Sequence, residues 1–362
     1  MKKIGAVLLT LLACLVMLEI GLRAIGRGPT NMADGTAEQD GDSFRLKKNS
    51  TKVIKYPAYT YTMHTNEFGF RDRSTGRRDL AGKPFYAFLG ASDVFGNGVE
   101  YEDSFVGIFA AEAKKKGYEV LNLAIGGHFF LDGEDILKKF IKETGYKPAT
   151  VVFCANALHI PVFDRRNKNV IVKSGYPMER DNWRVTYVRL LAGNVSSAFC
   201  FFRDGIRRIQ ERYLDYEAIS KSPPEFIRAY AKANPIRDPE RLKDFEAFLA
   251  GFEAYCRENA IALVYVHLPL SDSFKLADML TMLGADPDDY DASFYGDLMR
   301  SHCTRAGLPL VDPTPVLQAH YAAGRELRFK LDPHYNGFAN RVIGEYLAEA
   351  LLGALPGSPE ER

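Results

Sequence analysis

Short apolar runs alternate with amphipathic stretches along most of this chain of 362 residues. Apolar runs of strand length lie at 84–89, 119–124, 149–154, 261–268 and 308–311. Apolar residues recur at helical spacing over 104–116, 132–144, 240–259, 291–306 and 337–352. This alternation predicts an α/β fold in which a parallel sheet of five strands is covered by helices on both faces. Functional sites in such sheets lie at the carboxyl ends of the strands.

The segment 160–235 interrupts this alternation. It is too long for a simple crossover and has helical patterns of its own, so it predicts a helical insertion. Between Ile160 and Tyr213 there are 11 Lys or Arg residues against 5 Asp or Glu residues. We favour a solvated insertion. The alternative is a cap beside the site that faces anionic polysaccharide or lipid headgroups.

The first 27 residues have the pattern of a membrane anchor. Lys2 and Lys3 precede an apolar run from Ile4 to Ile20, which only Thr10 and Glu19 interrupt. A positive start before such a run predicts a signal sequence or signal anchor whose start stays in the cytoplasm. No Ala-x-Ala cleavage site follows. We therefore expect an uncleaved single-pass anchor over 1–27 in a bacterial inner membrane, with the rest of the chain facing the periplasm or the cell exterior.

Two other interpretations of this segment stay open. Leu11 to Cys14 resembles a lipobox, although the apolar run continues to Leu18, where a lipoprotein normally turns polar. A buried N-terminal helix would also be apolar, but the two lysines favour the membrane.

The residues after the anchor are polar. Residues 28–58 are irregular in pattern, with no periodicity from Asp34 to Asp42, and we expect 28–79 to be a juxtamembrane linker and lead-in. The folded domain is then expected over 80–355, including the insertion.

The composition is that of a folded domain, with 46% apolar and 26% charged residues. A net charge of +1 does not indicate a nucleic-acid partner. The cysteines show neither CxxC pairs nor metal-ligand spacing, so no metal or other cofactor is expected. Those outside the anchor are expected to be buried thiols, although an exported protein could pair them: Cys154, Cys200, Cys256 and Cys303.

A serine follows the first predicted strand, in the tetrapeptide from Gly90 to Asp93. A tight turn between a buried strand and a helix displays a nucleophile, here Ser92. The second strand leads to Gly127, where glycine lets a backbone N–H approach a substrate closely, and the third ends at Asn156, which has a side-chain amide. The N–H groups of Ser92 and Gly127 and the Asn156 amide would together form an oxyanion hole.

Asp332 and His334 stand two positions apart before the last predicted helix. Side chains at i and i+2 of an extended segment point the same way, so these two could lie together. His334 would be the general base and Asp332 would fix its tautomer. Each part of this site also has a plainer interpretation as a turn or a helix cap. The order of the parts at successive strand ends favours a site.

Six other histidines compete for the role of base. His267 lies inside a predicted strand and is expected to be a core histidine. His128 and His159 follow the two oxyanion positions, so we expect them, with Asp93, to line the same pocket as substrate contacts or as structure. A metal held by these three residues and His334 is a weaker rival, because no local histidine pair supports it. The remaining three lie in the lead-in or lack a carboxylate at short spacing: His64, His302 and His320.

This order of elements resembles the SGNH/GDSL hydrolase superfamily over about residues 80–353. The stretch from Asn66 to Arg71 also resembles a segment of its membrane-anchored bacterial members. The two-residue spacing from Asp to His resembles the alginate O-acetyltransferase-like branch. The resemblance is carried by these residues: Gly90, Ser92, Asn122, Gly127, Asn156, Asp332, His334 and Asn336.

The resemblance implies a flavodoxin-like three-layer α/β/α fold (the SGNH hydrolase fold) and acyl ester chemistry. It implies Ser92 as the nucleophile, Gly127 and Asn156 as oxyanion donors, and His334 with Asp332 as the base and its orienting partner. The chain departs from the family pattern in having Gly-Ala-Ser for Gly-Asp-Ser, and in having Cys154 and Ala157 where glycine and aspartate are usual.

None of these departures removes a proton-transfer group or an oxyanion donor. We therefore expect a serine esterase that acts on ester bonds of O-acyl groups, with an O-acetylated extracytoplasmic carbohydrate as its substrate. One alternative is an O-acetyltransferase that uses the same triad within a complex for polysaccharide export or modification. A further alternative is a catalytically degenerate domain that binds polysaccharide.

Overall fold

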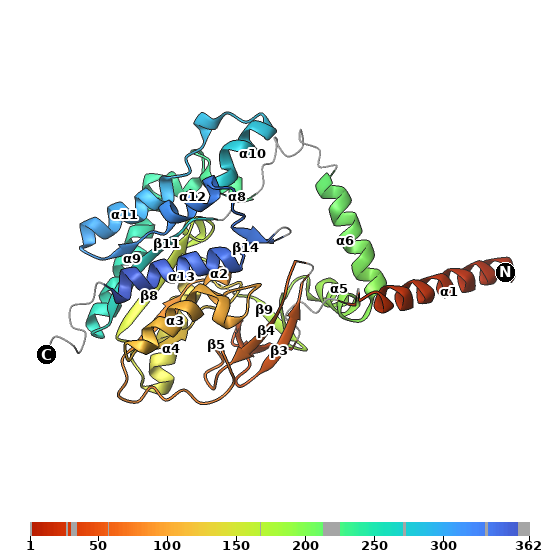
Figure 1. The fold of residues 1–362 in the computed structure, drawn as a ribbon, viewed down its shortest axis with the longest axis horizontal. Helices are drawn as coiled ribbons and strands as arrows, with labels where there is room; N and C mark the ends of the chain where they lie inside the picture. Colours follow the sequence, from red (N-terminus) through yellow and green to blue (C-terminus); the bar gives the residue numbers. More distant parts are fainter. Residues whose placement is uncertain are drawn as a thin grey trace.

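The computed structural model describes residues 2–26, 28–29, 35–56, 58–166, 168–212, 225–270, 273–329 and 332–353. At its centre is a five-stranded sheet in the order β12-β11-β8-β6-β7 (Figure 1), and every neighbouring pair is parallel. The predicted five-stranded parallel sheet is therefore confirmed. Its strands are β6 (Phe85–Leu89), β7 (Glu119–Asn122), β8 (Thr150–Asn156), β11 (Ala262–Leu268) and β12 (Leu310–Val311).

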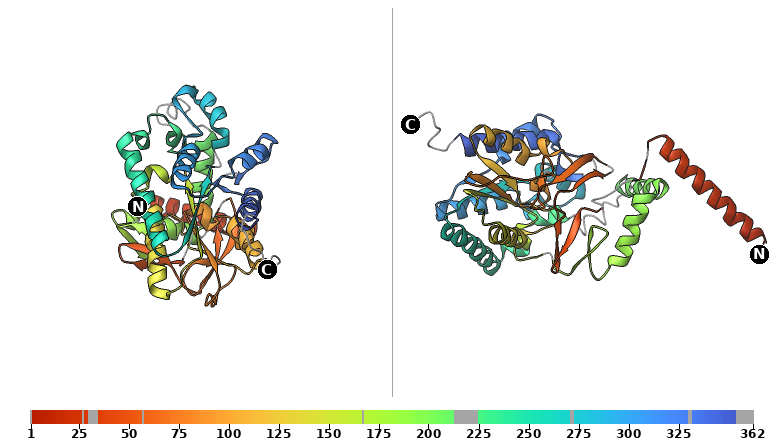
Figure 2. Two further views of the ribbon diagram at one scale, coloured as in Figure 1. Left: turned by 90° about the vertical axis from the view of Figure 1, so that its left-hand side faces the viewer. Right: turned by 90° about the horizontal axis from the view of Figure 1, so that it is seen from below.

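Helices cover both faces of this sheet, as the view from below in Figure 2 shows. On one face, α3 (Phe105–Lys115) packs against α13 (Gly337–Leu352). On the other, α4 (Phe130–Thr144) and α9 (Pro239–Glu258) lie together, with the rings of Phe130 and Phe248 stacked 6.4 Å apart. The helix α11 (Phe294–Ala306) packs on β11 and β12. The predicted three-layer α/β/α fold is confirmed.

The strand β6 lies inside the sheet, between β7 and β8, and all five of its residues are buried. The chain passes from β6 to β7 on one side and then crosses to β8 on the other. The carboxyl end of β6 is therefore a topological switch point, where open α/β sheets form their ligand-binding crevice.

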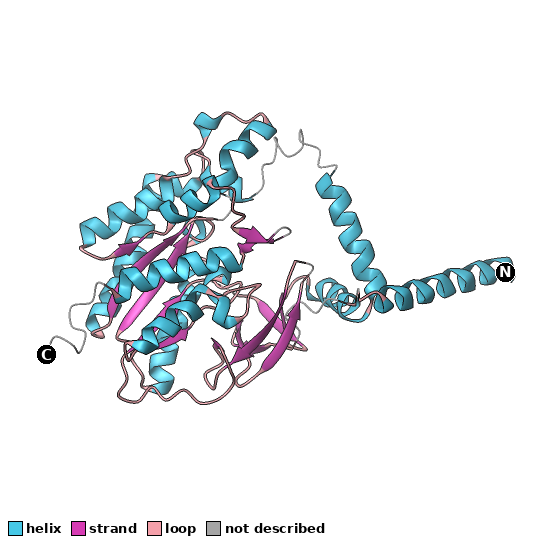
Figure 3. Ribbon diagram, in the orientation of Figure 1, coloured by secondary structure: helices cyan, strands magenta, loops and turns pink. Residues whose placement is uncertain are grey.

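The lead-in is not irregular (Figure 3). The strands β1 (Ala37–Asp40) and β2 (Ser43–Leu46) form a hairpin. The strands β3 (Thr51–Lys55), β4 (Thr60–Thr65) and β5 (Arg71–Asp72) form a second antiparallel sheet. The prediction of an aperiodic linker over 28–58 is therefore wrong. These strands have two to six residues, which is too short for their alternation to stand out in the sequence.

The insertion 160–235 is not purely helical either. The strands β9 (Val170–Lys173) and β10 (Tyr176–Glu179) form a hairpin. The Gln39 side chain joins it to the lead-in, because Nε2 donates to Val170 O at 3.0 Å and Oε1 accepts from Val172 N at 2.9 Å. Two parts that the sequence predicted to be separate are thus packed together. The domain boundaries themselves stay predictions.

The helix α1 (Lys2–Ala24) extends away from the body (Figures 1 and 2). Among the described residues it is the only single helix that is long and apolar enough to cross a membrane. This agrees with the predicted anchor, whereas the membrane and the orientation stay predictions. The other helices and strands are α2 (Ser92–Phe95), α5 (Trp183–Val195), α6 (Ser197–Arg212), α8 (Glu225–Tyr230), α10 (Leu276–Leu283), α12 (Thr314–Ala322), β13 (Arg328–Phe329) and β14 (Asp332–Tyr335).

All five cysteines lie in the described ranges, and none of them pairs with another. The four outside α1 are buried, as the sequence predicts.

One arginine joins the lead-in sheet to the body. Arg71, at the start of β5, is buried, and its guanidinium donates to the carbonyl oxygens of Phe95 (2.7 Å), Gly96 and Val99. The cation also lies over the rings of Tyr61, at 4.9 Å, and Phe95, at 5.1 Å. The planar guanidinium thus pairs three buried carbonyl oxygens that no helix or strand would pair.

The turn before Arg71 is fixed by its own residues. The Asn66 side chain accepts hydrogen bonds from the N–H groups of Phe68 (3.0 Å) and Phe70 (3.1 Å). Gly69 has φ +85°, and a Cβ there would lie 2.6 Å from a carbonyl oxygen of β2, so only glycine fits. The conformation of this turn is therefore fixed, and it directs the Arg71 side chain into the body.

We predict that Arg71→Lys destabilises the fold. Lysine keeps the charge but not the rigid fork, and each buried acceptor left unpaired costs about 1–3 kcal/mol. The free energy of unfolding in detergent, measured by denaturant titration, should fall by about 2–4 kcal/mol. The exposed Arg77 offers a matched control, because Arg77→Lys should change stability by less than about 0.5 kcal/mol. Equal stability of the two variants would contradict the role given to Arg71.

Candidate active site

Ser92 is the first residue of α2, just beyond the carboxyl end of β6. The bend between them needs Gly90, because a Cβ at that position would lie 2.3 Å from Val94 Cγ2. The N–H of Ser92 is in the first turn of the helix, where no intrahelical acceptor exists. Within the described ranges it has no other acceptor. A free donor therefore lies next to the serine hydroxyl, as an oxyanion hole requires.

The structure brings Asp332 and His334 together in β14. Nδ1–H of His334 donates to Asp332 Oδ1 at 2.5 Å, and the backbone N–H of His334 donates to the same oxygen at 3.0 Å. This hydrogen bond favours the tautomer in which Nε2 carries the lone pair. His334 is therefore oriented as a base that accepts a proton at Nε2.

Electrostatics supports this assignment. Burial lowers the pKa of His334, but the hydrogen bond to Asp332 and the negative charges of Asp93 and Asp332 outweigh it, so the pKa is raised above its usual value. Burial raises the pKa of Asp332, but its hydrogen bonds with His334 and Tyr59 hold that pKa below its usual value. Asp332 thus stays ionised beside the histidine.

Ser92 and His334 lie at the same edge of the sheet, because α2 packs against β14. Nε2 of His334 lies 3.5 Å from Nδ2 of Asn97. Among the hydrogen bonds of the described residues there is none between Ser92 and His334. Catalytic hydrogen bonds are often long in ligand-free structures and tighten when substrate binds.

Asn156, at the end of β8, is oriented by its own turn. Its Oδ1 accepts from the N–H groups of Leu158 (3.0 Å) and His159 (3.1 Å). Nδ2 therefore points the other way and donates to Asp93 Oδ2 at 3.4 Å. Burial, and then repulsion from Asp332, raise the pKa of Asp93. The Asn156 amide is thus directed at the residue next to Ser92.

The glycine loop after β7 also reaches Ser92. A Cβ on Gly126 would lie 3.9 Å from Ser92 Cβ and 3.7 Å from Asn97 Nδ2. The neighbouring Gly127 has φ +83°, which suits glycine. The carboxyl ends of β6, β7 and β8 therefore meet around the serine. The role of the Gly127 N–H as a donor stays a prediction.

The lead-in contributes to the site, which the sequence reasoning missed. The hydroxyl of Tyr59 donates to Asp332 Oδ2 at 3.2 Å, and that of Tyr61 donates to Asn97 Oδ1 at 3.2 Å. Burial raises the pKa of Tyr59 strongly and that of Tyr61 to about 12, so both remain donors at neutral pH. The sequence signal that could have pointed to them is that Tyr59 and Tyr61 are two positions apart, a spacing typical of one face of a strand.

His128 and His159 do not join this network. The buried His128 packs edge-on against Phe44, with ring centroids 4.5 Å apart. His159 packs against Phe129 (6.0 Å) and Phe130 (5.9 Å), and burial lowers its pKa to about 4. No three His, Cys, Asp or Glu side chains meet as metal ligands within the described part of the chain. A role for these histidines in substrate contact stays a prediction.

The other histidines lie away from this network. His267 is buried in β11, as expected of a core histidine. His302 lies 2.6 Å from Glu253, a carboxylate distant in the sequence. His64 bonds to Thr51 at 2.8 Å, and His320 packs on Phe338.

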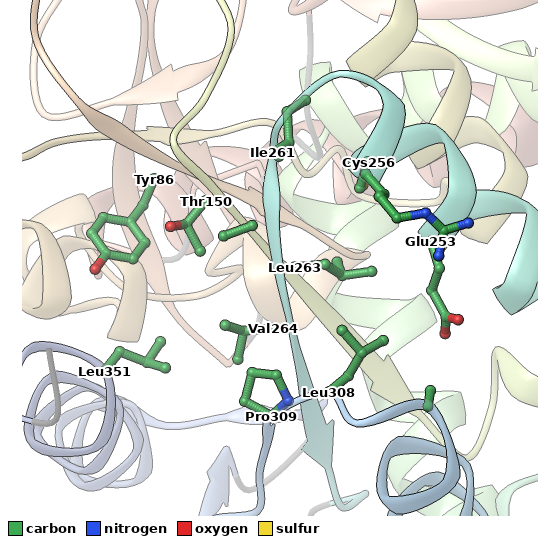
Figure 4. Close-up of a pocket in the computed structure, with 13 residues that line it drawn as sticks. Tyr86, Thr150, Glu253, Cys256, Ile261, Leu263, Val264, Leu308, Pro309 and Leu351 are labelled. Carbon is green, nitrogen blue, oxygen red and sulfur yellow. The ribbon is translucent and has the colours of Figure 1, made fainter.

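The cavity in Figure 4 belongs to the opposite end of the sheet. It has a volume of about 610 Å³ and opens near Tyr86, Thr150 and Ala262, close to the amino-terminal ends of their strands. It therefore has no part in the arrangement around Ser92.

No family model and no curated protein matches the chain. Solved structures resemble it at low identity. They include a member of the lipolytic protein G-D-S-L family from Veillonella parvula, with 11% identity, a TM-score of 0.37 and coverage of 75% of this chain and 99% of the other. An acetyl xylan esterase has 14% identity, a TM-score of 0.40 and coverage of 74% and 99%. A catalytic mutant of an acetylxylan esterase from Geobacillus stearothermophilus has 11% identity, a TM-score of 0.37 and coverage of 74% and 92%. Likenesses at this level carry no inference about chemistry.

We predict that Asp93→Asn lowers the pKa of His334, because the Asp93 carboxylate is one of the charges that raise it. An NMR titration of the histidine ring protons should show His334 titrating above about 6.5 in the wild type and closer to that value in the variant. The His334→Gln spectrum identifies the resonance. Asp79→Asn, at a side chain that is 71% exposed, is the control and should leave the titration unchanged. An unshifted pKa in Asp93→Asn would refute this coupling.

Proposed function

We propose that this chain is a serine esterase that removes O-acyl groups, above all O-acetyl groups, from an extracytoplasmic carbohydrate. The observation that carries this proposal is the arrangement at one edge of the sheet. At the switch point lies a serine whose backbone N–H has no acceptor among the described residues. Its helix packs against the strand that carries a histidine whose Nδ1 donates to an ionised aspartate. The Asn156 amide is directed to the same place.

The proposed reaction begins when Ser92 Oγ attacks the ester carbonyl carbon and its proton passes to His334 Nε2. The oxyanion accepts hydrogen bonds from the N–H groups of Ser92 and Gly127 and from Asn156 Nδ2. Collapse of the intermediate breaks the bond to the alkoxide, which takes the proton from His334. Water then attacks the acyl carbonyl carbon and gives its proton to His334 Nε2. The bond from the acyl carbon to Ser92 Oγ breaks, the carboxylic acid leaves, and His334 returns the proton to Ser92 Oγ. Asp332 remains ionised throughout.

Aromatic side chains beside this pair support a carbohydrate substrate. Tyr56 stacks on Tyr59 at 5.0 Å, and Tyr59 packs on Phe329 at 4.7 Å, next to Asp332. Aromatic rings with polar tips bind surfaces that are apolar on one side and hydrated on the other, as the faces of sugar rings are.

The same site would also support transfer of the acyl group to a sugar hydroxyl, because only the second nucleophile differs. The two outcomes are separated by incubating the protein with an acetyl ester donor and an oligosaccharide acceptor. Free acetate indicates the esterase, and acetylated oligosaccharide indicates the transferase. Binding of the oligosaccharide without either product indicates the degenerate binding domain.

We predict that Ser92→Ala lowers kcat for a short acyl ester by at least about 10,000-fold, because the nucleophile is lost. A fluorophosphonate should label the wild type at Ser92 and leave the variant unlabelled. Ser74→Ala, at an exposed serine, is the matched control and should keep both activity and labelling. Turnover in folded Ser92→Ala at the wild-type rate would refute the proposal.

We predict that Asn156→Ala lowers kcat by about 100- to 1,000-fold with little change in KM, because its amide acts on charge that develops in the transition state. Steady-state kinetics on the same ester measures this. A variant that raised only KM would show that Asn156 binds the ground state instead.

A further inference from the structure

Glu19 is the one acidic residue in α1, and it binds the start of another helix. Its carboxylate accepts hydrogen bonds from the backbone N–H groups of Ser197 (3.0 Å) and Ala198 (2.9 Å) and from Ser196 Oγ (3.1 Å). A carboxylate at this position satisfies donors that a helix leaves unpaired at its N-terminus. The only acidic side chain of an apolar helix is thus explained as a cap for α6.

The end of α5 is bound to α1 as well. Arg23 Nη2 donates to Val195 O at 2.7 Å, and Arg23 Nε donates to Glu19 at 2.7 Å. The bend between α5 and α6 measures 114°. We call α5, α6 and this bend the corner. The corner is fastened to the last turns of α1, at the end of that helix nearer the body (Figures 1 and 2).

The corner exposes apolar side chains that nothing in the described structure covers. On α5 the exposed positions 185, 188, 191 and 195 recur at helical spacing and so share one face. On α6, Phe202 is 50% exposed, and it lies beside the exposed Phe201 and Ile206. A group of large exposed apolar side chains marks an interaction surface.

Cationic groups accompany this surface. The ring of Trp183 lies under Arg184, at 5.2 Å, and Lys173, at 5.5 Å. Both cationic side chains are exposed. Helices that combine aromatic and aliphatic residues with arginines lie in the headgroup region of anionic membranes.

The direction of α6 relative to α1 gives a further argument. In Figures 1 and 2, α6 leaves the end of α1 in a different direction and does not run alongside it. If α1 crosses a bilayer, its body-proximal end lies at the membrane surface, and the corner lies there with it.

We propose that the corner is a second membrane-binding element, which lies in the headgroup region of the leaflet from which α1 emerges. Its occupant is an anionic phospholipid bilayer, with the apolar side chains among the acyl chains and the cations of Lys173 and Arg184 at the phosphates. The inference rests on α1 as the anchor and is independent of the ester chemistry.

The test uses the full-length protein in vesicles of phosphatidylethanolamine and phosphatidylglycerol with brominated acyl chains. Trp183 is the only tryptophan, so Trp183→Phe gives a silent background. Into it are placed Val188→Trp, Phe202→Trp or Thr304→Trp, the last at an exposed position of α11, on the far side of the body from α1. The first two should be quenched at least about two-fold more than the third.

Equal quenching of all three tryptophans would overturn the proposal. Shielding of positions 188 and 202 from both brominated lipid and aqueous acrylamide would also overturn it, because a protein would then cover the corner.

A second comparison tests the link to α1. In the Phe202→Trp protein, Glu19→Ala should reduce lipid quenching, because the cap that holds the corner is lost. Thr10→Ala, at the other polar position inside the apolar run, should leave the quenching unchanged. Unchanged quenching in Glu19→Ala would overturn the assignment of Glu19 as the link.

Discussion

The buried guanidinium of Arg71 is the contact on which the rest of this structure depends. It pairs three carbonyl oxygens in the segment that follows Ser92, and two aromatic rings enclose it. That segment has little regular structure of its own, since α2 has only four residues. The position of the serine is therefore set from outside the α/β body, by a residue of the lead-in. Burying a cation among carbonyls is costly unless its donors are paired. Both terminal nitrogens of this guanidinium are paired, so the contact leaves little room for alternatives.

The candidate site is accordingly shared by three segments that are distant in sequence. The switch point of the sheet supplies Ser92 and the Asn156 amide, and the last hairpin supplies Asp332 and His334. The lead-in supplies Tyr59, which binds the second oxygen of Asp332. A histidine-bound carboxylate with its other oxygen also paired has a fixed plane, and so has the imidazole it holds. Tyr59 thus acts on the orientation of the base through Asp332.

The α/β body and the residues around Ser92 could be predicted because both have a recognisable pattern in the local sequence. Buried parallel strands read as apolar runs, and the site residues follow strand ends in order. The strands of the lead-in have no such continuous apolar run, because each is short and polar residues alternate with buried ones in β2 and β4. The roles of Arg71 and Tyr59 could not be predicted, since their partners lie 24 and 273 positions away. Contacts at such separations depend on the tertiary fold and have no periodicity to reveal them. The role of Glu19 could not be predicted either, because its partners Ser197 and Ala198 lie 178 and 179 positions away.

The folded lead-in shortens the connection between α1 and the α/β body. A coil of about 50 residues would give its cargo a root-mean-square reach of about 40 Å. Here α1 ends at Ala24 and β1 already begins at Ala37, and the strands that follow are part of the body. If α1 crosses a membrane, the site is therefore held closer to the membrane surface than a coil of about 50 residues would hold it. A substrate of the proposed kind would then have to reach the site near that surface, and the groups modified would be those that come within this distance of it.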